Sequence, residues 1–268
     1  MSDTNLELIE TRCLQSRQGV AITCDRFGTG PPLVLVHGSF CDHRTNWQFV
    51  APEFARHVTV HALARRGRDK TDATEGHSVA DEADDVAALI EAIDGPVHLL
   101  GHSYGALVAL EAAPLVRQRI AKLVLYEPPL PEAVSAKEVA ALEAFAAAGD
   151  WEGYTTAFLR DQLSLSDSDL ADMRATPLWS QFVAEAPPTR HDLLALPGHS
   201  FDPKRFAGLD MPVMLQIGTE SRRETYATDA LAAVLPNARI VDLPGHGHDA
   251  VLTAPEVYAR QVIGFLRG

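Results

Sequence analysis

The sequence predicts an α/β fold in which helices cover both faces of a mostly parallel β-sheet. Short apolar runs alternate with stretches of helical periodicity along most of the chain, which is the pattern of repeated strand–helix units. The run Leu33-Val34-Leu35-Val36 is apolar at every position, as expected for a strand that is buried on both faces. Short connections between the units favour parallel strands joined by crossover helices.

The first two strands are predicted to be antiparallel, and the later elements follow as strand–helix units. Residues 6–14 and 20–27 have strand character and flank a turn that contains glycine, which predicts a hairpin. Apolar runs predict further strands at 33–36, 58–60, 96–100, 120–126, 211–217 and 240–243. Apolar residues at helical spacing predict helices at 78–94, 106–116, 224–235 and 255–266, the first of them capped by Ser78.

One segment, residues 128–203, interrupts this alternation, and we call it the helical insertion. Its composition predicts helices at 132–148, 151–163, 167–174 and 178–185 and no strand of the sheet. The prolines that separate these helices are Pro177, Pro187, Pro188 and Pro197. We therefore expect the sheet and its helices to be formed by residues 1–127 and 204–268.

Composition and charge argue against several classes of function. The 268-residue chain has 23 Lys and Arg against 36 Asp and Glu, a formal charge of −13, so it lacks an overall basic footprint for nucleic acid. No apolar run approaches the roughly 18 residues that span a bilayer, and the first residues lack a signal-peptide pattern. Three cysteines without C-x-x-C spacing argue against a disulfide framework or a structural zinc site. We expect a cytoplasmic protein without nucleic-acid or membrane partners, either a monomer or a homodimer.

The segment Gly101-His102-Ser103-Tyr104-Gly105 is the clearest chemical signal in the chain. It fits the pattern G-x-S-x-G and lies between a predicted strand and a predicted helix. A tight strand-to-helix turn would hold the serine hydroxyl above the sheet, at a helix N-terminus whose N–H groups favour an anion. Ser103 is therefore the predicted nucleophile.

A serine nucleophile needs a base and a site for the oxyanion. Among the 11 histidines, those of Gly245-His246-Gly247-His248 follow the last predicted strand, at the sheet edge where Ser103 lies. The turn His37-Gly38-Ser39 follows the strand 33–36 at the same edge. The backbone N–H groups of Ser39 and Tyr104 are the predicted oxyanion donors.

Together these motifs resemble the α/β-hydrolase family, specifically its capped branch. The motifs that carry the resemblance are 33–38, the turn 101–105, the closing segment Leu243-Pro244-Gly245-His246-Gly247-His248, and Ala64-Arg65-Arg66-Gly67-Arg68, which is similar to an arginine–glycine loop of the family. The resemblance runs from about residue 20 to 266. It implies an eight-stranded, mostly parallel sheet, the helical insertion 128–203 as a lid over the site, and His248 as the catalytic histidine, with His246 as the alternative.

The acid is where the sequence departs from the common pattern of the family. Most members have an Asp shortly after the seventh strand, where this chain has Glu220 and Ser221. The haloalkane-dehalogenase-like branch uses a glutamate after the sixth strand, which corresponds to Glu127 here. A glutamate at the mouth of an apolar strand is costly without a partner, which favours Glu127. Glu220 and a dyad without an acid remain alternatives.

Other residues are candidates for substrate contact. We predict that Phe40, His102, Trp151 and Trp179 bind substrate, although packing within the helical insertion accounts equally well for the last two. The Arg65, Arg66 and Arg68 side chains fit a solvated loop paired with Asp69 and Asp72 better than a substrate-carboxylate site. No cluster has metal-ligand spacing, and no glycine-rich phosphate loop is present.

These residues predict a serine hydrolase that cleaves an ester, lactone or related acyl bond of a small, largely apolar molecule, without a cofactor. Epoxide hydrolysis and dehalogenation are disfavoured, because those branches of the family have an Asp nucleophile where this chain has Ser103. Carbon–carbon bond hydrolysis and cofactor-free haloperoxidase chemistry on the same triad remain open. A hydrolase-like small-molecule receptor or scaffold is the alternative from another class.

Overall fold

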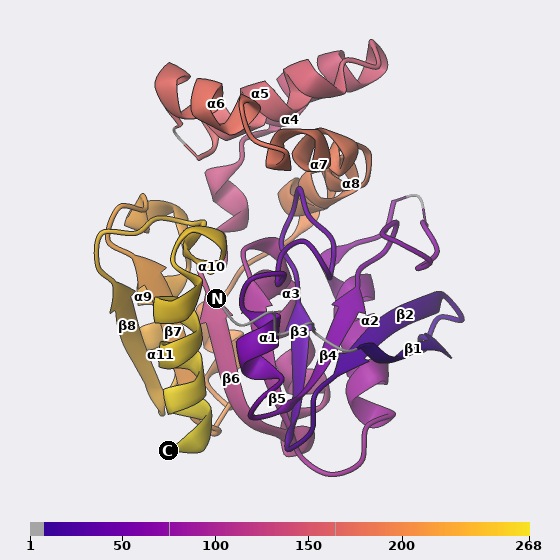
Figure 1. Ribbon diagram of the computed structural model, residues 1–268, viewed down its shortest axis with the longest axis vertical. Coiled ribbons are helices and arrows are strands. Elements are labelled where there is room, and N and C mark those ends of the chain that lie inside the picture. Colours follow the sequence, from indigo (N-terminus) through magenta and orange to yellow (C-terminus); the bar gives the residue numbers. More distant parts are fainter. Residues whose placement is uncertain (1–7, 75, 164) are drawn as a thin grey trace.

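The computed structural model describes residues 8–74, 76–163 and 165–268, and an eight-stranded sheet runs through it (Figure 1). Positions 6 and 7 of the first predicted strand lie outside the described residues. The strands are β1 (Leu8–Gln15), β2 (Ala21–Phe27), β3 (Pro32–Val36), β4 (Thr59–Ala64), β5 (Val97–His102), β6 (Ile120–Tyr126), β7 (Val213–Gly218) and β8 (Ala238–Leu243). Their order in the sheet is β1-β2-β4-β3-β5-β6-β7-β8.

The sheet is parallel from β4 to β8, and only the pairs β1–β2 and β2–β4 are antiparallel. The predicted hairpin and the mostly parallel sheet are therefore confirmed. Val36 of β3 pairs with Gly101 of β5, and Tyr126 of β6 pairs with both His102 and Gln216. Because these strands are parallel and in this register, the loops that follow them meet at one edge of the sheet.

Helices cover both faces of the sheet. One face packs on α2 (Val79–Glu91), α3 (Tyr104–Leu115) and α9 (Thr228–Ala232), and the other on α1 (Ala51–Phe54), α10 (Ala250–Thr253) and α11 (Pro255–Arg267). Val34 and Val36 belong to the first core, whereas Leu33 and Leu35 belong to the second. This alternation explains why β3 is apolar at every position.

The helical insertion contains α4 (Ala136–Ala147), α5 (Trp151–Asp161), α6 (Asp167–Arg174), α7 (Leu178–Ala184) and α8 (Ala186–Ala195). Figure 1 shows these helices gathered at one end of the molecule, above the sheet in this view. Ser135 and Ser166 cap α4 and α6 by accepting from the backbone N–H of the third helical residue, as Ser78 does for α2.

Helix α8 is not predicted by the sequence, because Pro187 and Pro188 read as a break between helices. In the structure the two prolines lie in the first turn of α8, where the N–H groups have no partner within the helix and proline is tolerated. The prolines therefore begin a helix. Short 3₁₀ turns complete the elements at Arg117–Arg119, Pro131–Ala133, Leu196–Gly198, Pro203–Phe206 and Arg223–Thr225.

The helix predicted at 224–235 is shorter than expected, since α9 covers only Thr228–Ala232. The preceding backbone forms an antiparallel bridge in which Tyr226 pairs with Pro129. Leu130 N–H donates to Thr225 O at 2.9 Å, and Ala227 N–H donates to Pro128 O at 2.9 Å. Because these residues form the bridge, they cannot continue the helix toward its predicted start. The bridge also places Tyr226 at the edge of the sheet where β6 ends.

Among the described residues, no helix combines the length and the apolar character that crossing a bilayer requires. All three cysteines are free thiols.

Candidate active site

Ser103 lies in a strained turn between β5 and α3. Its backbone has φ 56° and ψ −128°, a conformation that non-glycine residues rarely adopt. A Cβ on Gly101 would collide with the backbone of Gly105 and Ala106, and a Cβ on Gly105 would collide with that of Val36 and His37. The two glycines of the motif therefore allow the strand–turn–helix to close. The Ser103 hydroxyl does not cap α3 and is free to face the loops that follow β6 and β8.

His248 joins Ser103 to a buried carboxylate. Its Nε2 is 2.9 Å from Ser103 Oγ, and its Nδ1 is 2.5 Å from Glu127 Oε2. His246, the alternative base, contributes backbone bonds instead: its N–H donates to Leu243 O at 3.2 Å and its carbonyl accepts from Glu220 N–H at 3.0 Å. The structure thus brings together Ser103, His248 and Glu127.

The Glu127 carboxylate is fully buried, and both of its oxygens have partners. Oε1 accepts from Gly218 N–H at 2.7 Å, while Oε2 faces the imidazole. These bonds offset the cost of removing a carboxylate from water. Glu220, by contrast, is exposed on the loop after β7. Glu127 is therefore the carboxylate that the structure places on His248.

Tyr226 is a member of the site that the sequence did not indicate. Its ring stacks on the His248 imidazole, with centroids 5.5 Å apart and planes at 13°, and its hydroxyl is 3.2 Å from His248 Nδ1. Burial, together with the charge of Glu127 and a hydrogen bond to it, raises the pKa of Tyr226 well above its ordinary value. No local motif marks this tyrosine, because the bridge to Pro129 places it.

The predicted substrate residue His102 lies between two loops of the site. Its Nε2 is 3.0 Å from the His248 carbonyl, and its Nδ1 is 3.0 Å from Asn46 Oδ1, which also accepts from Gly38 N–H at 3.0 Å. Burial and the neighbouring His248 lower the pKa of His102 to about 3. Both ring nitrogens of His102 therefore face protein oxygens, which leaves neither nitrogen for a ligand.

The loop 37–40 approaches the serine closely enough to serve as one side of an oxyanion site. A Cβ on Gly38 would lie 3.0 Å from Ser103 Cβ. Arg65 Nη1 donates to Gly38 O at 3.1 Å, and Ser39 Oγ donates to Asp192 Oδ2 at 2.8 Å. Tyr104, whose N–H is the other predicted donor, is the first residue of α3.

The arginines after β4 are buried, so the predicted solvated loop is wrong. Arg65 Nε is 2.9 Å from Glu82, Arg66 Nε is 2.6 Å from Asp85, and Arg68 Nη2 is 2.7 Å from Asp192. The predicted partner Asp69 instead contacts Arg44 at 3.3 Å, and the Asp72 side chain accepts from Ala21 N–H. A buried guanidinium group needs a carboxylate partner to offset its loss of hydration. The three arginines therefore pair with carboxylates of the protein and are not available to bind a substrate carboxylate.

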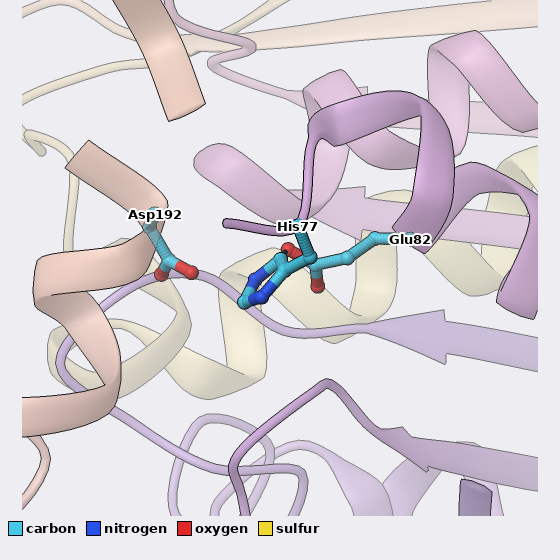
Figure 2. Close-up of side chains that lie close together, drawn as sticks. All are labelled: His77, Glu82 and Asp192. Atoms are coloured by element: carbon cyan, nitrogen blue, oxygen red, sulfur yellow. Dashed lines mark ion pairs between the residues drawn. The ribbon is translucent and has the colours of Figure 1, made fainter. Parts of the chain in front are cut away.

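One group of side chains in the described part of the chain has the proximity of a metal site: His77, Glu82 and Asp192 (Figure 2). Its charges argue against that use. Both oxygens of Asp192 accept from the guanidinium groups of Arg65 and Arg68, so positive charge already surrounds this carboxylate. His77 Nε2 is 3.4 Å from Glu82 Oε1 and pairs with it. We therefore describe the group as an ionic network.

The three predicted aromatic contacts lie in different surroundings. Phe40 is buried against the insertion, with its ring centroid 4.6 Å from that of Phe158. Trp151 is half-buried, 5.7 Å from the ring of Tyr154. Trp179 faces the Arg174 guanidinium at 4.9 Å. Phe40 and Trp151 thus belong to an apolar cluster shared by the insertion and the loop 37–40.

Comparisons with known proteins agree with this geometry. A sequence profile described as "Alpha/beta hydrolase family" matches residues 33–261. The crystal structure of an alpha/beta hydrolase from Sphaerobacter thermophilus DSM 20745 is 30% identical with a TM-score of 0.81, over 95% of this chain and 100% of that one. The "Non-heme chloroperoxidase" of Streptomyces lividans is 28% identical over 261 residues, 89% of this chain and 92% of the relative.

A further relative is longer than this chain. The "Dihydrolipoyllysine-residue acetyltransferase component of acetoin cleaving system" of Pseudomonas putida is 29% identical over 255 residues, and the match covers 89% of this chain but 64% of that protein. The chain therefore spans less than two thirds of the length of this relative.

The profile match extends from β3 into α11 and includes Ser103, Glu127 and His248. The fold similarity covers almost the whole chain. The chain therefore belongs to the α/β-hydrolase family.

Proposed function

We propose that this enzyme is a serine hydrolase that cleaves an ester, lactone or related acyl bond of a small, largely apolar molecule. The observation that carries the proposal is the hydrogen-bonded chain from Ser103 Oγ through His248 to the buried Glu127 carboxylate. A serine with a base on its hydroxyl, and an acid that orients the base, is the arrangement that activates an otherwise weak nucleophile.

The reaction would proceed in two halves. Ser103 Oγ attacks the carbonyl carbon as His248 Nε2 accepts the hydroxyl proton, and Glu127 stabilises the resulting imidazolium. The N–H groups of Ser39 and Tyr104 donate to the oxyanion of the tetrahedral intermediate. The carbon–oxygen bond to the leaving group then breaks, and His248 returns its proton to the departing oxygen. In the second half His248 deprotonates a water that attacks the acyl-enzyme. The bond between the acyl carbon and Ser103 Oγ then breaks, His248 returns the proton to Ser103 Oγ, and the acid product leaves.

The helical insertion has the position of a lid in this proposal. The apolar cluster that includes Phe40 and Trp151 lies between the insertion and the loop 37–40, so it would favour an apolar acyl or alcohol group. A lid also excludes water other than the one that completes the reaction.

Cofactor-free haloperoxidase chemistry is a second candidate, since the triad is compatible with it and a relative is named non-heme chloroperoxidase. Carbon–carbon bond hydrolysis uses the same nucleophile and base. A receptor or scaffold would bind a small molecule tightly with almost no turnover, which separates it from all of these enzymes.

A panel of esters, lactones and thioesters of varied acyl length tests the proposal. We expect turnover of at least one class, and we expect Ser103→Ala to reduce kcat on it by a factor on the order of 10⁶, as losing a triad serine does in other enzymes. The matched control is Ser168→Ala on the exposed surface of α6, which should keep full activity. Turnover that survives Ser103→Ala would contradict the proposal.

A further inference from the structure

Helix α8 of the insertion holds the loop that carries the proposed oxyanion donor Ser39. Phe40 N–H donates to Thr189 Oγ1 at 2.8 Å, and Ser39 Oγ donates to Asp192 Oδ2 at 2.8 Å. Thr189 and Asp192 are three residues apart on α8, so both lie on the same side of the helix. Both are fully buried. Two successive residues of the loop therefore contact one face of one helix of the insertion.

Phe40 shows how much the loop depends on these contacts. Its backbone has φ 56°, and a bulky residue keeps this conformation only where its surroundings enforce it. The insertion makes two of the contacts that enforce it. Thr189 Oγ1 accepts from the Phe40 N–H, and the Phe158 ring packs on the Phe40 ring with the centroids 4.6 Å apart. The turn that aims Ser39 is thus held on one side by the insertion.

Arg65 ties the same helix to a third residue of the loop, Gly38. Its Nη1 donates to Gly38 O at 3.1 Å and to Asp192 Oδ2 at 3.2 Å. Its guanidinium also lies over the ring of Tyr104, 4.5 Å from the centroid. A single buried cation therefore contacts the loop, the insertion and the residue that provides the second proposed donor.

We propose that Thr189 and Asp192 are positioning residues that hold the loop 37–40 in its oxyanion-binding shape, so that docking of the insertion and completion of the oxyanion hole are one event. The inference rests on the proposed function. Ser103 can therefore form a tetrahedral intermediate only when α8 is packed against the loop 37–40, with the substrate beneath the insertion.

Thr189→Val tests the proposal, because it keeps the shape of the side chain and removes the acceptor of Phe40 N–H. Thr189→Ser restores the hydroxyl. The matched control is Thr155→Val, since Thr155 is also fully buried in the insertion but its hydroxyl donates to Trp151 O within α5. The readouts are kcat and KM on a turned-over ester, the labelling rate of Ser103 by a fluorophosphonate, and hydrogen exchange of the backbone amides in 37–41.

We expect Thr189→Val to lower kcat and the labelling rate about tenfold with little change in KM. Losing an oxyanion donor outright costs about 10²- to 10³-fold, and a displaced donor loses part of that. Amide exchange in 37–41 should rise in Thr189→Val, and Thr189→Ser should recover at least half of the lost rate. Thr155→Val should lower the melting temperature without these effects.

The result that overturns the inference is a Thr189→Val enzyme with wild-type kcat, labelling rate and amide exchange. That result differs from failure of the proposed function, in which the wild-type enzyme itself turns over no ester and is not labelled at Ser103. In the latter case the inference fails with the function on which it rests.

Discussion

Residues with unusual backbone conformations gather where the chemistry is proposed. Four non-glycine residues in the described part of the chain have positive φ, and three of them, Phe40, Ser103 and Glu127, lie at the candidate site. Each such conformation costs on the order of 1–3 kcal/mol, so the surrounding contacts must enforce it. The glycines on either side of Ser103 and the Gly218 N–H on Glu127 are such contacts.

The acid can be assigned by a pair of variants. Glu127→Gln keeps the volume of the side chain but removes the charge that stabilises the His248 imidazolium, so we expect kcat to fall by about 10⁴-fold, as the loss of a triad acid does elsewhere. Glu220→Gln changes an exposed side chain and should have less than a twofold effect. Both are measured as kcat on one good ester. The reverse ranking would move the acid to the loop after β7.

Helix α8 is fixed to Arg65 and Arg68, which follow β4, by a buried ionic network. The Asp192 carboxylate accepts from the guanidinium groups of Arg65 and Arg68, and all three side chains are buried. Removing one partner of a buried ion pair leaves charge without compensation, which is far more costly than losing an exposed pair. The helical insertion is therefore held by charge as well as by its apolar contacts.

Asp192→Asn should therefore destabilise the protein by about 3–5 kcal/mol, because two buried guanidinium groups lose their shared carboxylate. Urea denaturation followed by circular dichroism measures this free energy of unfolding. Asp172→Asn is the matched control, since Asp172 lies exposed on α6 and should change stability by less than about 0.5 kcal/mol. Equal stability of the two variants would show that the network does not hold α8.

The same ionic network makes the stability of the protein depend on pH. Burial lowers the pKa of His77, but the hydrogen bond and charge of Glu82 and the Thr74 carbonyl outweigh it, so the pKa is raised. Asp192 and the ring of His191, 5.6 Å away, also face this side chain. The folded state therefore binds the His77 proton more tightly than the unfolded state does.

The sign of the effect follows from that raised pKa. The stabilisation by protonated His77 is complete below about pH 6.5, the ordinary value, and is lost as the pH rises through the folded value. The free energy of unfolding of the wild type, minus that of His77→Gln, should therefore decline as the pH is raised above about 6.5. Urea titrations across this range measure the difference. A difference that is flat or rises with pH would contradict the assignment.

Local patterns in the sequence predict the strands of the sheet and the turn that carries Ser103. The alternating burial of Leu33 and Val34 and the strand–turn–helix at Ser103 depend on neighbouring residues, and both are found as expected. The partners of Arg65 are different, because Asp192 is 127 residues away along the chain and lies on a helix that begins with prolines. Tyr226 reaches His248 only through the bridge to Pro129. Local sequence patterns do not reveal such contacts between segments that are far apart in the chain.

The identity of the nucleophile is tested by finding where an electrophile attaches to the protein. The wild-type enzyme is treated with a fluorophosphonate, its intact mass is measured, and the modified peptide is sequenced. Activation of Ser103 by His248 and Glu127 predicts one added phosphonyl group on Ser103, and none on Ser103→Ala under the same conditions. Labelling of another residue, or equal labelling of Ser103→Ala, would contradict the claim that Ser103 is the nucleophile.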